Sequence, residues 1–413
     1  MPTLLQINVA SNYGSTGKIA EQIGLLSEKE GWTCYIAHGA RFHNPSQLKT
    51  FQIDSFWGEC VHKGFHSLLL DKDGLGSKKA TKKLVKYIKE IVRPDIIHIH
   101  NIHGYYINYK VLFDYLLETD VPIVWTLHDC WPFTGHCTHF ELKGCTKWQT
   151  GCNSCPQKRE TPPSLWLDSS QSNYQLKQRL FTALGDRLTL IPVSDWLAHL
   201  LKLSFFKNSK INTIHNGIDI NTFVPSSSDN IIKQYNLKGK FVLLGVALPW
   251  TARKGLYDFI ELRKILPEQY AIILLGLSKK QQSKLPSGII GLERTQNVQE
   301  MVELYSAADI LVNPTYEDNY PTINLEAMAC GTPVITYKTG GSPEAVIDGT
   351  GVIVDQGSVT QVVEAIHMLE NQDQDTLRKQ CRNHAVSCFD KKKCFQTYLD
   401  LYQQILNQSN SKD

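Results

Sequence analysis

Short apolar runs, rich in β-branched residues, alternate with longer amphipathic stretches along most of the chain. The apolar runs of the first half lie at residues 4–9, 33–37, 95–100, 123–127, 188–193 and 211–214. Those of the second half lie at residues 241–246, 271–276, 310–313, 333–336 and 352–354. Helical spacing fills intervening segments such as 17–29 and 77–93. This rhythm predicts repeated strand–helix units and therefore an α/β fold built on parallel sheets.

The pattern also divides the chain into two similar halves. Residues 93–101 and 307–314 share the order of a helix end, a buried strand and polar residues after it. We expect two Rossmann-like doubly wound domains facing a central cleft, since such sheets bind ligands beyond the carboxyl ends of their strands. The predicted domains cover residues 1–217 and 218–388. A segment rich in Cys, Trp, Pro and Gly, about 130–172, is interpreted as an insertion in the first domain.

Composition narrows the class of protein. The 413 residues include 43 Lys and Arg against 40 Asp and Glu, so the net charge is only +3 and a strongly basic nucleic-acid binder is excluded. The hydrophobic fraction of 42% is that of a folded chain. No apolar run reaches the roughly 18 residues of a membrane span, and the N-terminus reads as a strand rather than a signal peptide. A cytoplasmic location is therefore expected.

Residues 313–333 carry the densest chemical signal. A polar loop follows the strand at 310–313 and leads through a proline into a helix that ends at Gly331. Its candidate ligand-binding residues are Glu317, Asp318, Asn319, Tyr320, Pro321, Thr322 and, two turns into the helix, Glu326. Loop amides and a helix N-terminus suit an anion such as a diphosphate. The alternative interpretation is a capped helix with surface acids.

The sequence Glu326-Ala-Met-Ala-Cys-Gly-Thr-Pro-Val334 resembles the Glu-Ala-Met-Ala-x-Gly-x-Pro-Val motif of family 4 retaining glycosyltransferases, which have the GT-B fold. The loop before it departs from the common form, in which an acid precedes the helix glutamate by seven intervening residues. Eight residues separate Glu317 from Glu326, whereas Asp318 keeps the seven-residue spacing. Which of the two acids contacts the sugar is left open.

Further matches to this family lie elsewhere in the chain. His215-Asn-Gly-Ile-Asp219 resembles the segment at the family's domain junction, and Arg253-Lys254 resembles the basic pair that holds the donor phosphates. His128 ends a strand, where the family has a histidine that meets the donor sugar. The resemblance implies catalytic roles for His128, Glu317, Arg253 and Lys254, and donor binding by residues 318–322 and Glu326. Taken alone, neighbouring cations are more often surface residues and a lone histidine is more often structural.

Gly14-Ser15-Thr16-Gly17 follows the first predicted strand and opens a helix. It is not a nucleotide P-loop, because that pattern requires Gly at position 12 and Ser or Thr at position 19, which are Asn12 and Ile19. The family places an acceptor or phosphate-contacting loop here, and that role is the expectation.

Four cysteines cluster in the segment 130–172. Cys137, Cys145, Cys152 and Cys155 have the spacing Cys-x7-Cys-x6-Cys-x2-Cys, which ends in a standard metal chelate. Four thiolates fit a structural zinc ion, with an iron–sulfur cluster or free buried thiols as alternatives. All ligand positions of such a site would be filled by protein, so the metal is expected to be structural. No cofactor is expected to be required for catalysis, because the basic pair and the helix N-terminus that the family resemblance assigns to the donor phosphates take the place of a catalytic ion.

The segment 77–93 predicts an amphipathic helix with a basic face. Its cations are Lys78, Lys79, Lys82, Lys83, Lys86, Lys89 and Arg93. A solvated surface and a contact with anionic lipid are both compatible with this pattern. The second would hold the protein peripherally at the inner face of the membrane.

The family resemblance implies transfer of a hexosyl group from a nucleotide sugar, a UDP- or GDP-sugar, to a hydroxyl of a glycan or lipid-linked acceptor. It further implies retention at the anomeric carbon, a use in cell-surface polysaccharide synthesis, and a last helix, 389–413, that returns to the first domain. Two alternatives are a GT-B-fold nucleotide-sugar 2-epimerase and a non-catalytic, metal-stapled scaffold at the membrane.

Overall fold

The computed structural model describes residues 1–410, which form two compact units. The first contains residues 1–215 and the C-terminal segment from Phe395; the second contains residues 216–394. The boundary falls two residues before the one expected at 217, and residues 389–394 belong to the second unit rather than to a returning segment. Each unit has its own sheet and hydrophobic core.

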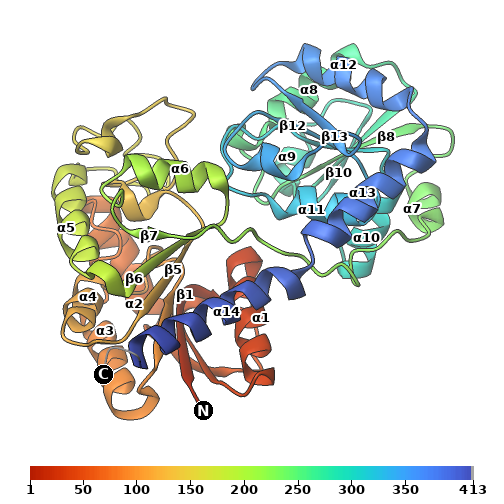
Figure 1. Cartoon of the computed structure of the whole chain (residues 1–413). Coiled ribbons are helices and arrows are strands. Elements are labelled where there is room, and N and C mark those ends of the chain that lie inside the picture. Colours follow the sequence, from red (N-terminus) through yellow and green to blue (C-terminus); the bar gives the residue numbers. More distant parts are fainter. Residues whose placement is uncertain (411–413) are drawn as a thin grey trace. The chain divides into compact units, whose positions relative to one another are not determined.

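The first unit is built on a seven-stranded parallel sheet in the order β3-β2-β1-β4-β5-β6-β7 (Figure 1). Its strands are β1 (Thr3–Ser11), β2 (Thr33–His43), β3 (Lys49–Gln52), β4 (Ile96–Ile99), β5 (Ile123–Leu127), β6 (Leu188–Pro192) and β7 (Lys210–Ile211). Its helices are α1 (Gly14–Lys29), α2 (Phe56–Val61), the π-helical η1 (His62–Leu69), α3 (Lys78–Tyr87), the π-helical η2 (Ile88–Val92), α4 (Tyr109–Leu117), α5 (Ser170–Thr182) and α6 (Asp195–Leu203).

Helices cover both faces of this sheet. Successive side chains of a strand point to opposite faces. Trp125 of β5 packs against Phe113 of α4 and Phe181 of α5 on one face. On the other face, Gln6 Nε2 of β1 donates to the Ala20 carbonyl of α1 at 2.8 Å. The unit is therefore doubly wound, as the strand–helix rhythm predicts.

The C-terminal helix α14 (Lys391–Asn410) lies on the same face as α1. Tyr402 OH bonds His98 Nδ1 of β4 at 2.6 Å, and Thr126 of β5 donates to Tyr398 OH at 3.1 Å. The β1–β4 register pairs Gln6 with His98, so both side chains belong to the face that α1 covers. From Phe395 onward this helix is part of the first unit.

The second unit has a six-stranded parallel sheet in the order β10-β9-β8-β11-β12-β13. Its strands are β8 (Phe241–Val246), β9 (Tyr270–Leu275), β10 (Ile289–Leu292), β11 (Ile310–Asn313), β12 (Val334–Tyr337) and β13 (Gly351–Val354). Its helices are α7 (Asp229–Gln234), α8 (Leu256–Ile265), α9 (Lys279–Gln282), α10 (Val298–Ala307), α11 (Thr322–Ala329), α12 (Val359–Glu370) and α13 (Gln374–Cys388), with 3₁₀ turns η6 (Ala252–Lys254) and η7 (Ser342–Ala345).

The cysteine-bearing segment lies between β5 and α5. Its regular structure is two short 3₁₀ turns, η3 (Trp131–Phe133) and η4 (Lys147–Gln149); a third, η5 (Gly185–Arg187), follows α5. An aromatic group holds the segment together: Trp148 stacks on Phe140 at 4.8 Å between ring centroids and meets Phe133 edge-on. These rings join the core of the first unit, so the segment is packed although it lacks strands or helices of its own.

Candidate functional site

The loop after β11 brings the acidic residues of the second unit to the start of α11. Pro321 precedes the helix with an extended backbone (φ −69°, ψ 117°), and Thr322 is the first helical residue. The amides at the start of a helix have no partners within it and carry a partial positive charge. Asn319 N–H donates to the Asp318 carboxylate at 3.0 Å within the loop. This end of α11 is suited to an anionic ligand.

A buried polar network fixes α11 on its sheet. Asn313 at the end of β11 donates to Asn324 Oδ1 at 2.9 Å, and Asn324 Nδ2 donates to Ser342 Oγ at 3.0 Å. Ser342 Oγ in turn bonds Thr336 Oγ1 of β12 at 2.7 Å. All four side chains are buried. The sequence analysis missed this network, although a short polar residue in each of four adjoining apolar segments was a visible signal.

The basic turn η6 lies directly against the acidic loop. Lys254 Nζ forms an ion pair with Asp318, and both side chains are about four-fifths buried. Tyr316 N–H donates to the Arg253 carbonyl at 2.8 Å, and Arg253 Nη1 lies 3.5 Å from the Glu317 carbonyl. The structure therefore brings together the cations and acids that the sequence analysis selected.

The two candidate acids of the loop differ in their surroundings. The Glu317 side chain is buried, with 4% of the residue exposed, and the Glu317 carbonyl accepts the hydroxyl of Thr315 at 3.1 Å. The half-buried Asp318 holds the ammonium group of Lys254. Glu326, on α11, accepts the hydroxyl of Tyr305 at 2.9 Å. Glu326 thus has an orienting partner that its motif did not reveal.

Residues 216–219, which resemble the family's domain-junction segment, contact the same loop and the start of α14. Asn216 Nδ2 lies 3.4 Å from the Tyr320 carbonyl, and Lys391 forms an ion pair with Asp219 at 2.7 Å. Gly217 packs so tightly against Lys391 that an added Cβ would lie 2.6 Å from its Cα. The residues of the motif thus have packing and positioning contacts.

His128, in the first unit, ends a chain of hydrogen bonds that begins inside the sheet. His100 Nε2 bonds Gln6 Oε1 at 3.0 Å, and His100 Nδ1 bonds His128 Nε2 at 3.2 Å. Burial lowers the pKa of His128 from 6.5 to about 4, and it lowers that of His100 well below 6.5. Both imidazoles are therefore neutral at pH 7, and His128 is placed as a hydrogen-bonding group rather than a cation.

The Gly14–Gly17 sequence forms the first turn of α1, at the carboxyl end of β1. Gly14 has a φ of 61°, with no atom near its missing Cβ. Gly17 is packed: a Cβ there would lie 3.1 Å from the Cβ of Ala10. Ser15 is exposed and Thr16 is half-buried.

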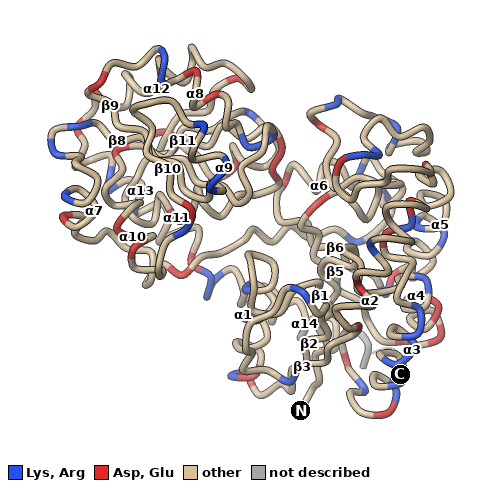
Figure 2. Tube along the Cα trace, turned by 180° about the vertical axis from the view of Figure 1, so that it is seen from behind, with Lys and Arg blue, Asp and Glu red and all other residues tan. Residues whose placement is uncertain are grey.

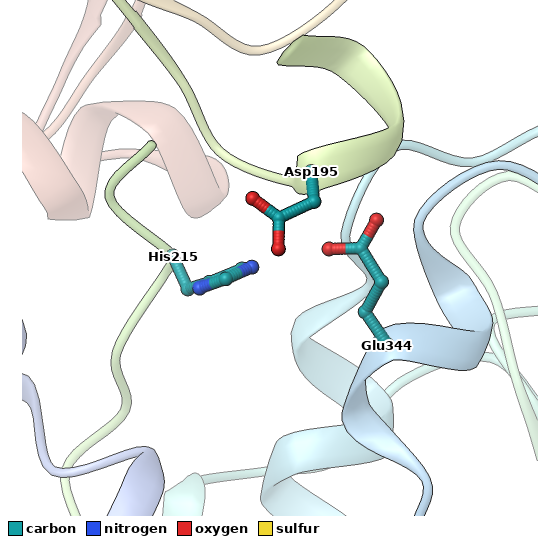
Figure 3. Close-up of side chains that lie close together, drawn as sticks. All are labelled: Asp195, His215 and Glu344. Carbon is teal, nitrogen blue, oxygen red and sulfur yellow. The ribbon is translucent and has the colours of Figure 1, made fainter. Parts of the chain in front are cut away.

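Further titratable groups lie near strand ends of the first unit. Figure 3 shows Asp195, in the first turn of α6 directly after β6, and His215, on the segment that follows β7. Glu344 of the second unit lies on η7. The sequence analysis did not single out Asp195 or Glu344.

The four candidate metal-binding cysteines line one pocket of the cysteine-bearing segment, together with Phe140 and Trp148. Among the described residues, no three of the four sulfurs form a group at metal-ligand spacing. Cys137 and Cys155 interact through their thiols, which raises the pKa of Cys137 and lowers that of Cys155. The remaining seven cysteines are also free thiols.

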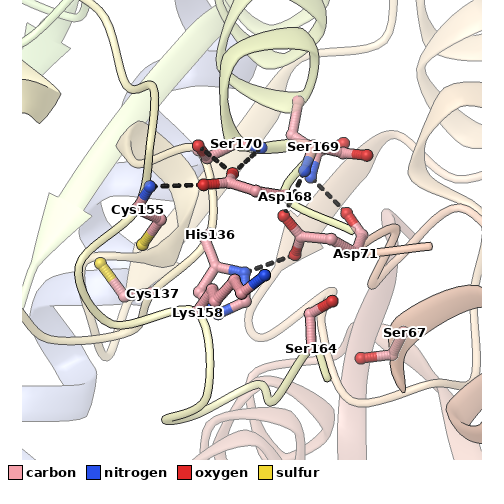
Figure 4. Close-up of polar contacts among 12 residues, drawn as sticks. Ser67, Asp71, His136, Cys137, Cys155, Lys158, Ser164, Asp168, Ser169 and Ser170 are labelled. Carbon is pink, nitrogen blue, oxygen red and sulfur yellow. Dashed lines mark hydrogen bonds and ion pairs between the residues drawn. The ribbon is translucent and has the colours of Figure 1, made fainter. Parts of the chain in front are cut away.

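Polar contacts lie around the residues of this pocket (Figure 4). His136 Nδ1 bonds the Asp71 carboxylate, which also accepts the Ser169 amide at 2.7 Å. Asp168 accepts the Cys155 amide at 2.5 Å and the Ser170 amide at 2.9 Å. These contacts tie the cysteine loops to the segment after η1 and to the start of α5. No sequence spacing indicates the contacts of Asp71 with His136 and Ser169 or of Asp168 with Cys155, because these partners lie 65, 98 and 13 residues apart.

The predicted basic helix forms as α3 and η2. Leu84, Ile88 and Val92 are buried. The basic residues are exposed, and Figure 2 marks Lys and Arg positions along the chain in blue. An unpredicted apolar stripe lies on the preceding helix: Trp57, Val61 and Phe65, four residues apart, are 77%, 63% and 53% exposed. A hydrogen bond connects the helix that carries this stripe to the start of α3. The Gly76 amide, just before α3, donates to His62 Nε2 of η1 at 3.1 Å.

Comparison with known families identifies the family to which the chain belongs. The model for glycosyl transferases group 1 matches residues 227–387, and the model for Glycosyltransferase Family 4 matches residues 49–222. Together the two matches cover most of the chain. The chain belongs to the family 4 glycosyltransferases, and its two Rossmann-like units are those of the GT-B fold.

Individual relatives are more distant. The chain is 27% identical over 293 residues to a protein of Escherichia coli K12 named as a colanic acid biosynthesis glycosyl transferase, WcaC, covering 68% of this chain and 69% of that one. It is 26% identical to a D-inositol 3-phosphate glycosyltransferase of Thermobifida fusca, but spans only about half of that protein's length (48%). A capsular polysaccharide biosynthesis glycosyltransferase of Staphylococcus aureus, CapM, is 23% identical, over 54% of this chain and 63% of that one.

Solved structures share the fold over nearly the whole chain. Sucrose-phosphate synthase of Thermosynechococcus elongatus has a TM-score of 0.72 at 18% identity, covering 99% of this chain and 100% of that one. Anabaena HepE in complex with UDP-glucose has a TM-score of 0.64 at 17% identity, covering 99% of both chains. In the described part of this chain, no helix combines the length and the apolar character needed to cross a bilayer.

Proposed function

We propose that this glycosyltransferase moves a hexosyl group from a nucleotide-sugar donor, a UDP- or GDP-sugar, to a hydroxyl of a glycan or lipid-linked acceptor with retention at the anomeric carbon. The observation that carries the proposal is the contact of η6 with the loop before α11. There, two cations and the N-terminus of a helix adjoin a pair of acids. This combination suits a sugar diphosphate, whose phosphates need positive partners and whose hydroxyls need acceptors.

The chemistry follows from the charge that develops as the donor breaks. Departure of the nucleoside diphosphate places negative charge on its β-phosphate. Arg253, Lys254 and the backbone N–H groups at the start of α11 stabilise that charge because they are already oriented before reaction. The pairing of Lys254 with Asp318 keeps the cation in place before donor arrives. The acceptor's proton passes to the leaving phosphate, so the scheme needs no protein nucleophile and no cofactor.

The remaining roles are assigned by residue type and surroundings. Glu326, held by Tyr305, accepts the ribose hydroxyls. Asp318, which is less buried than Glu317, is the acid that reaches sugar hydroxyls, while Glu317 supports the loop from inside. Neutral His128 bonds the sugar, and the turn Gly14–Gly17 contacts acceptor or phosphate.

Use in cell-surface polysaccharide synthesis is proposed from the relatives' names, colanic acid for WcaC and capsular polysaccharide for CapM. A nucleotide-sugar donor is supported by HepE, which was solved with UDP-glucose. We further propose that the enzyme works in the cytoplasm, where nucleotide sugars are made, and that it reaches lipid-linked acceptors at the inner face of the membrane.

The membrane contact is supported by two adjoining surfaces. The exposed lysines of α3 suit anionic headgroups, and the stripe Trp57, Val61 and Phe65 suits the interfacial layer below them. Neither surface alone is specific, because solvated lysine faces and single exposed apolar residues are common. Their combination on connected helices favours docking to anionic lipid.

The donor is tested by thermal shifts with UDP, GDP and ADP and their common sugars, without added metal. A ligand that binds only the folded state raises its melting temperature, by an amount that grows with concentration above Kd. We expect a shift with one nucleotide class that Arg253→Ala and Glu326→Ala abolish. Lys279→Ala, on the exposed α9, is the matched control. Equal shifts for the wild type and both site variants would refute the assigned site, and no shift with any nucleotide would refute the donor class.

Membrane docking is tested with phosphatidylcholine vesicles, with and without phosphatidylserine. We expect co-sedimentation that requires phosphatidylserine, falls with salt and is lost in Trp57→Ser/Phe65→Ser and in Lys82→Glu/Lys83→Glu. Tyr257→Ser, an exposed aromatic of the second unit (66%), is the control. Sedimentation that is independent of lipid charge, or unchanged in these variants, would contradict the contact.

A further inference from the structure

We propose that Cys137, Cys145, Cys152 and Cys155 bind one structural zinc ion, and that Lys177 balances part of the charge of the resulting tetrathiolate. The four side chains line a single pocket of the segment between β5 and α5. Zinc sites with four cysteines are closed, so this ion would hold structure rather than take part in glycosyl transfer.

A metal ion would add to the stability of a segment that has little regular structure. Between Phe133 and Ser170 its regular structure is one 3₁₀ turn, η4, and the aromatic rings of Phe140 and Trp148 are its main apolar contribution to the core. Binding energy from a metal that is absent in the unfolded chain adds directly to folding free energy. A zinc ion joining residues 137, 145, 152 and 155 would close this segment into short loops.

Backbone donors are already directed at the sulfurs. Gly135 N–H donates to Cys152 Sγ at 3.2 Å, and the backbone of Gln157 interacts with the Cys155 thiol. Amide donors of this kind favour a thiolate over a thiol, because a thiolate is the stronger acceptor. Gly135 is also required sterically, since an added Cβ would lie 2.1 Å from the Ser170 carbonyl. The backbone that bonds Cys152 is therefore fixed in place.

The charge of the site is met by a buried cation. Four thiolates and one Zn²⁺ carry a net charge of −2, which is costly in a buried pocket without a counter-charge. Lys177 of α5 is 1% exposed, and its Nζ donates to the carbonyls of Trp131 at 2.7 Å and Thr134 at 3.0 Å. Burial lowers the pKa of Lys177 to about 7, and the neighbouring groups that oppose this shift are, in falling order, Asp73, Cys152, Cys137 and Asp129. A lysine is rarely buried this deeply without an anionic partner.

A second ring of contacts anchors the loops that carry the ligands. Asp168 holds the Cys155 amide, and His136, next to Cys137, is held through Nδ1 by Asp71 (Figure 4). Such outer contacts orient ligands around protein-bound metals. His136 Nε2 is buried, and it has no hydrogen-bond partner among the residues that the structure describes. Among the residues that line the pocket, His136 therefore offers a nitrogen that competes with the four sulfurs to bind the metal.

Metal binding must draw the sulfurs together. Zn–S bonds of about 2.3 Å in a tetrahedron place sulfurs about 3.8 Å apart. The four sulfurs now share the pocket without that spacing, at least among the described residues. Rotation of the cysteine side chains about their first torsion angle moves each sulfur without displacing the backbone. Binding releases thiol protons to solvent and lets zinc take their place.

The experiment measures metal in the full chain, purified under reducing conditions without added metal. We expect about one zinc ion per chain that dialysis does not remove. Cys152→Ser and Cys155→Ser should each lose it, while Cys388→Ser, an exposed cysteine of α13, should retain it. Lys177→Met should weaken zinc retention against a chelator, with the fold checked by circular dichroism.

Measurements on the wild-type chain test the proposal even where the variants fail to fold. Cobalt exchanged into the site should give an intense sulfur-to-cobalt charge-transfer band and the visible spectrum of a tetrahedral ion. A chelator should lower the melting temperature, and zinc should restore it. Wild-type protein without zinc, and with a melting temperature indifferent to chelator and zinc, would overturn the proposal.

Three other outcomes would also overturn it. Iron with the absorption of a cluster would replace zinc, and a Cys137–Cys155 disulfide under the same conditions would exclude the tetrathiolate. Retention of zinc by Cys145→Ser together with its loss in His136→Gln would replace the fourth sulfur with an imidazole.

Discussion

Gly255 is the residue on which the contact between the basic turn and the acidic loop depends. It follows Lys254 with a φ of 75°, and a Cβ there would lie 2.3 Å from the Pro314 carbonyl oxygen. The close approach lets η6 and the loop after β11 share a backbone contact as well as an ion pair. A glycine is thus required for two reasons, one conformational and one steric.

A comparison of Gly255→Ala with Gly239→Ala separates the conformational effect of the substitution from its steric effect. Gly239 has almost the same φ, 74°, but no atom within 4 Å of an added Cβ. We expect Gly239→Ala to cost about 1–2 kcal/mol of unfolding free energy, for the left-handed backbone alone. Gly255→Ala should cost about 1–3 kcal/mol more from the clash and should weaken nucleotide binding. Denaturant unfolding and nucleotide titration measure both effects. Equal costs for the two variants would show that the close contact with Pro314 carries no strain.

Tyr305 is a positioning residue for Glu326. Its hydroxyl donates at 2.9 Å, and burial together with the Glu326 carboxylate raises the pKa of Tyr305 well above 10, so the hydroxyl stays protonated. We expect Tyr305→Phe to weaken nucleotide binding by up to about tenfold, since a hydrogen bond to a charged group contributes about 1.5–3 kcal/mol. Calorimetric titration measures this, with Tyr257→Phe as the exposed control. Unchanged affinity with an unchanged fold would remove Glu326 from the donor site.

At the scale of residues, the motifs in the sequence predicted which residues share a site. They did not predict the hydrogen-bond partners of those residues. The sequence predicted that Lys254 and the acids near 317 serve one site, and the structure joins them. It gave no sign that Tyr305 faces Glu326 or that Gln6 bonds His100, because those partners lie 21 and 94 residues apart. Such pairs are set by the register of strands and helices, which a single sequence does not encode in its spacing.

At the scale of elements, the buried strands were predictable, and two of the four edge strands were not. Central strands such as β5 are buried along their whole length, which produces the continuous apolar runs seen in the sequence. The missed strands, β3 and β10, are edge strands of four residues. β3 reads Lys-Thr-Phe-Gln and is mostly exposed, so its sequence resembles a loop. An edge strand has one neighbour and needs a weaker pattern.

The docking of α14 on β4 and β5 depends on neutral histidine. Tyr402 OH bonds His98 Nδ1, and His98 Nε2 bonds Thr126 Oγ1 at 2.8 Å. Burial lowers the pKa of His98 from 6.5 to about 3, with neighbouring His128 adding to the shift. A neutral imidazole satisfies both contacts, accepting at one nitrogen and donating at the other. Protonation would make both nitrogens donors and would leave the tyrosine hydroxyl without its acceptor.

Mild acid should therefore destabilise the first unit. A histidine whose pKa is lowered on folding stays neutral below pH 6.5, where the unfolded chain is protonated, so stability falls as pH falls, by about 1.4 kcal/mol per pH unit for each such histidine. His98 and His128, with folded pKa values of about 3 and 4, share this window. We expect the melting temperature to drop between pH 7.5 and 5.5, with a smaller drop in His98→Gln. His199→Gln, exposed on α6, should keep the wild-type slope. A melting temperature that is constant over this range would contradict a neutral buried His98.

At the scale of the whole molecule, the sequence predicted the two Rossmann-like folds and their family. Strand periodicity determines fold class, and the motif 326–334 is specific enough to indicate the family that two family models then matched. The unit to which each helix belongs was less predictable. Residues 389–394 remain with the second unit, where Ile218 N–H donates to the Phe389 carbonyl and the Ile218 carbonyl accepts from Lys391 N–H, a long-range pairing without a local signal.

Each of the two units has its own sheet and core. We therefore expect a ligand that binds one unit to stabilise that unit without stabilising the other. The proposed zinc site lies within the first unit, and the proposed donor site around α11 lies within the second. Local opening is governed by contacts within a cooperative unit. Hydrogen exchange should therefore respond separately to each ligand. Chelation of zinc should raise exchange in residues 131–169, and the bound nucleotide should slow exchange in residues 313–330.

The comparison is informative in both directions, because each ligand serves as the control for the other. Saturating nucleotide added to chelated protein should still protect 313–330, since the proposed donor residues belong to the second unit and the cysteine pocket to the first. Loss of nucleotide protection after chelation would mean that the ion acts on donor binding, and would contradict a purely structural role confined to its own segment. Protection of 131–169 by nucleotide in the zinc-bound protein would likewise show that the units do not respond independently. Exchange measured by mass spectrometry at matched pH resolves all four combinations of the two ligands.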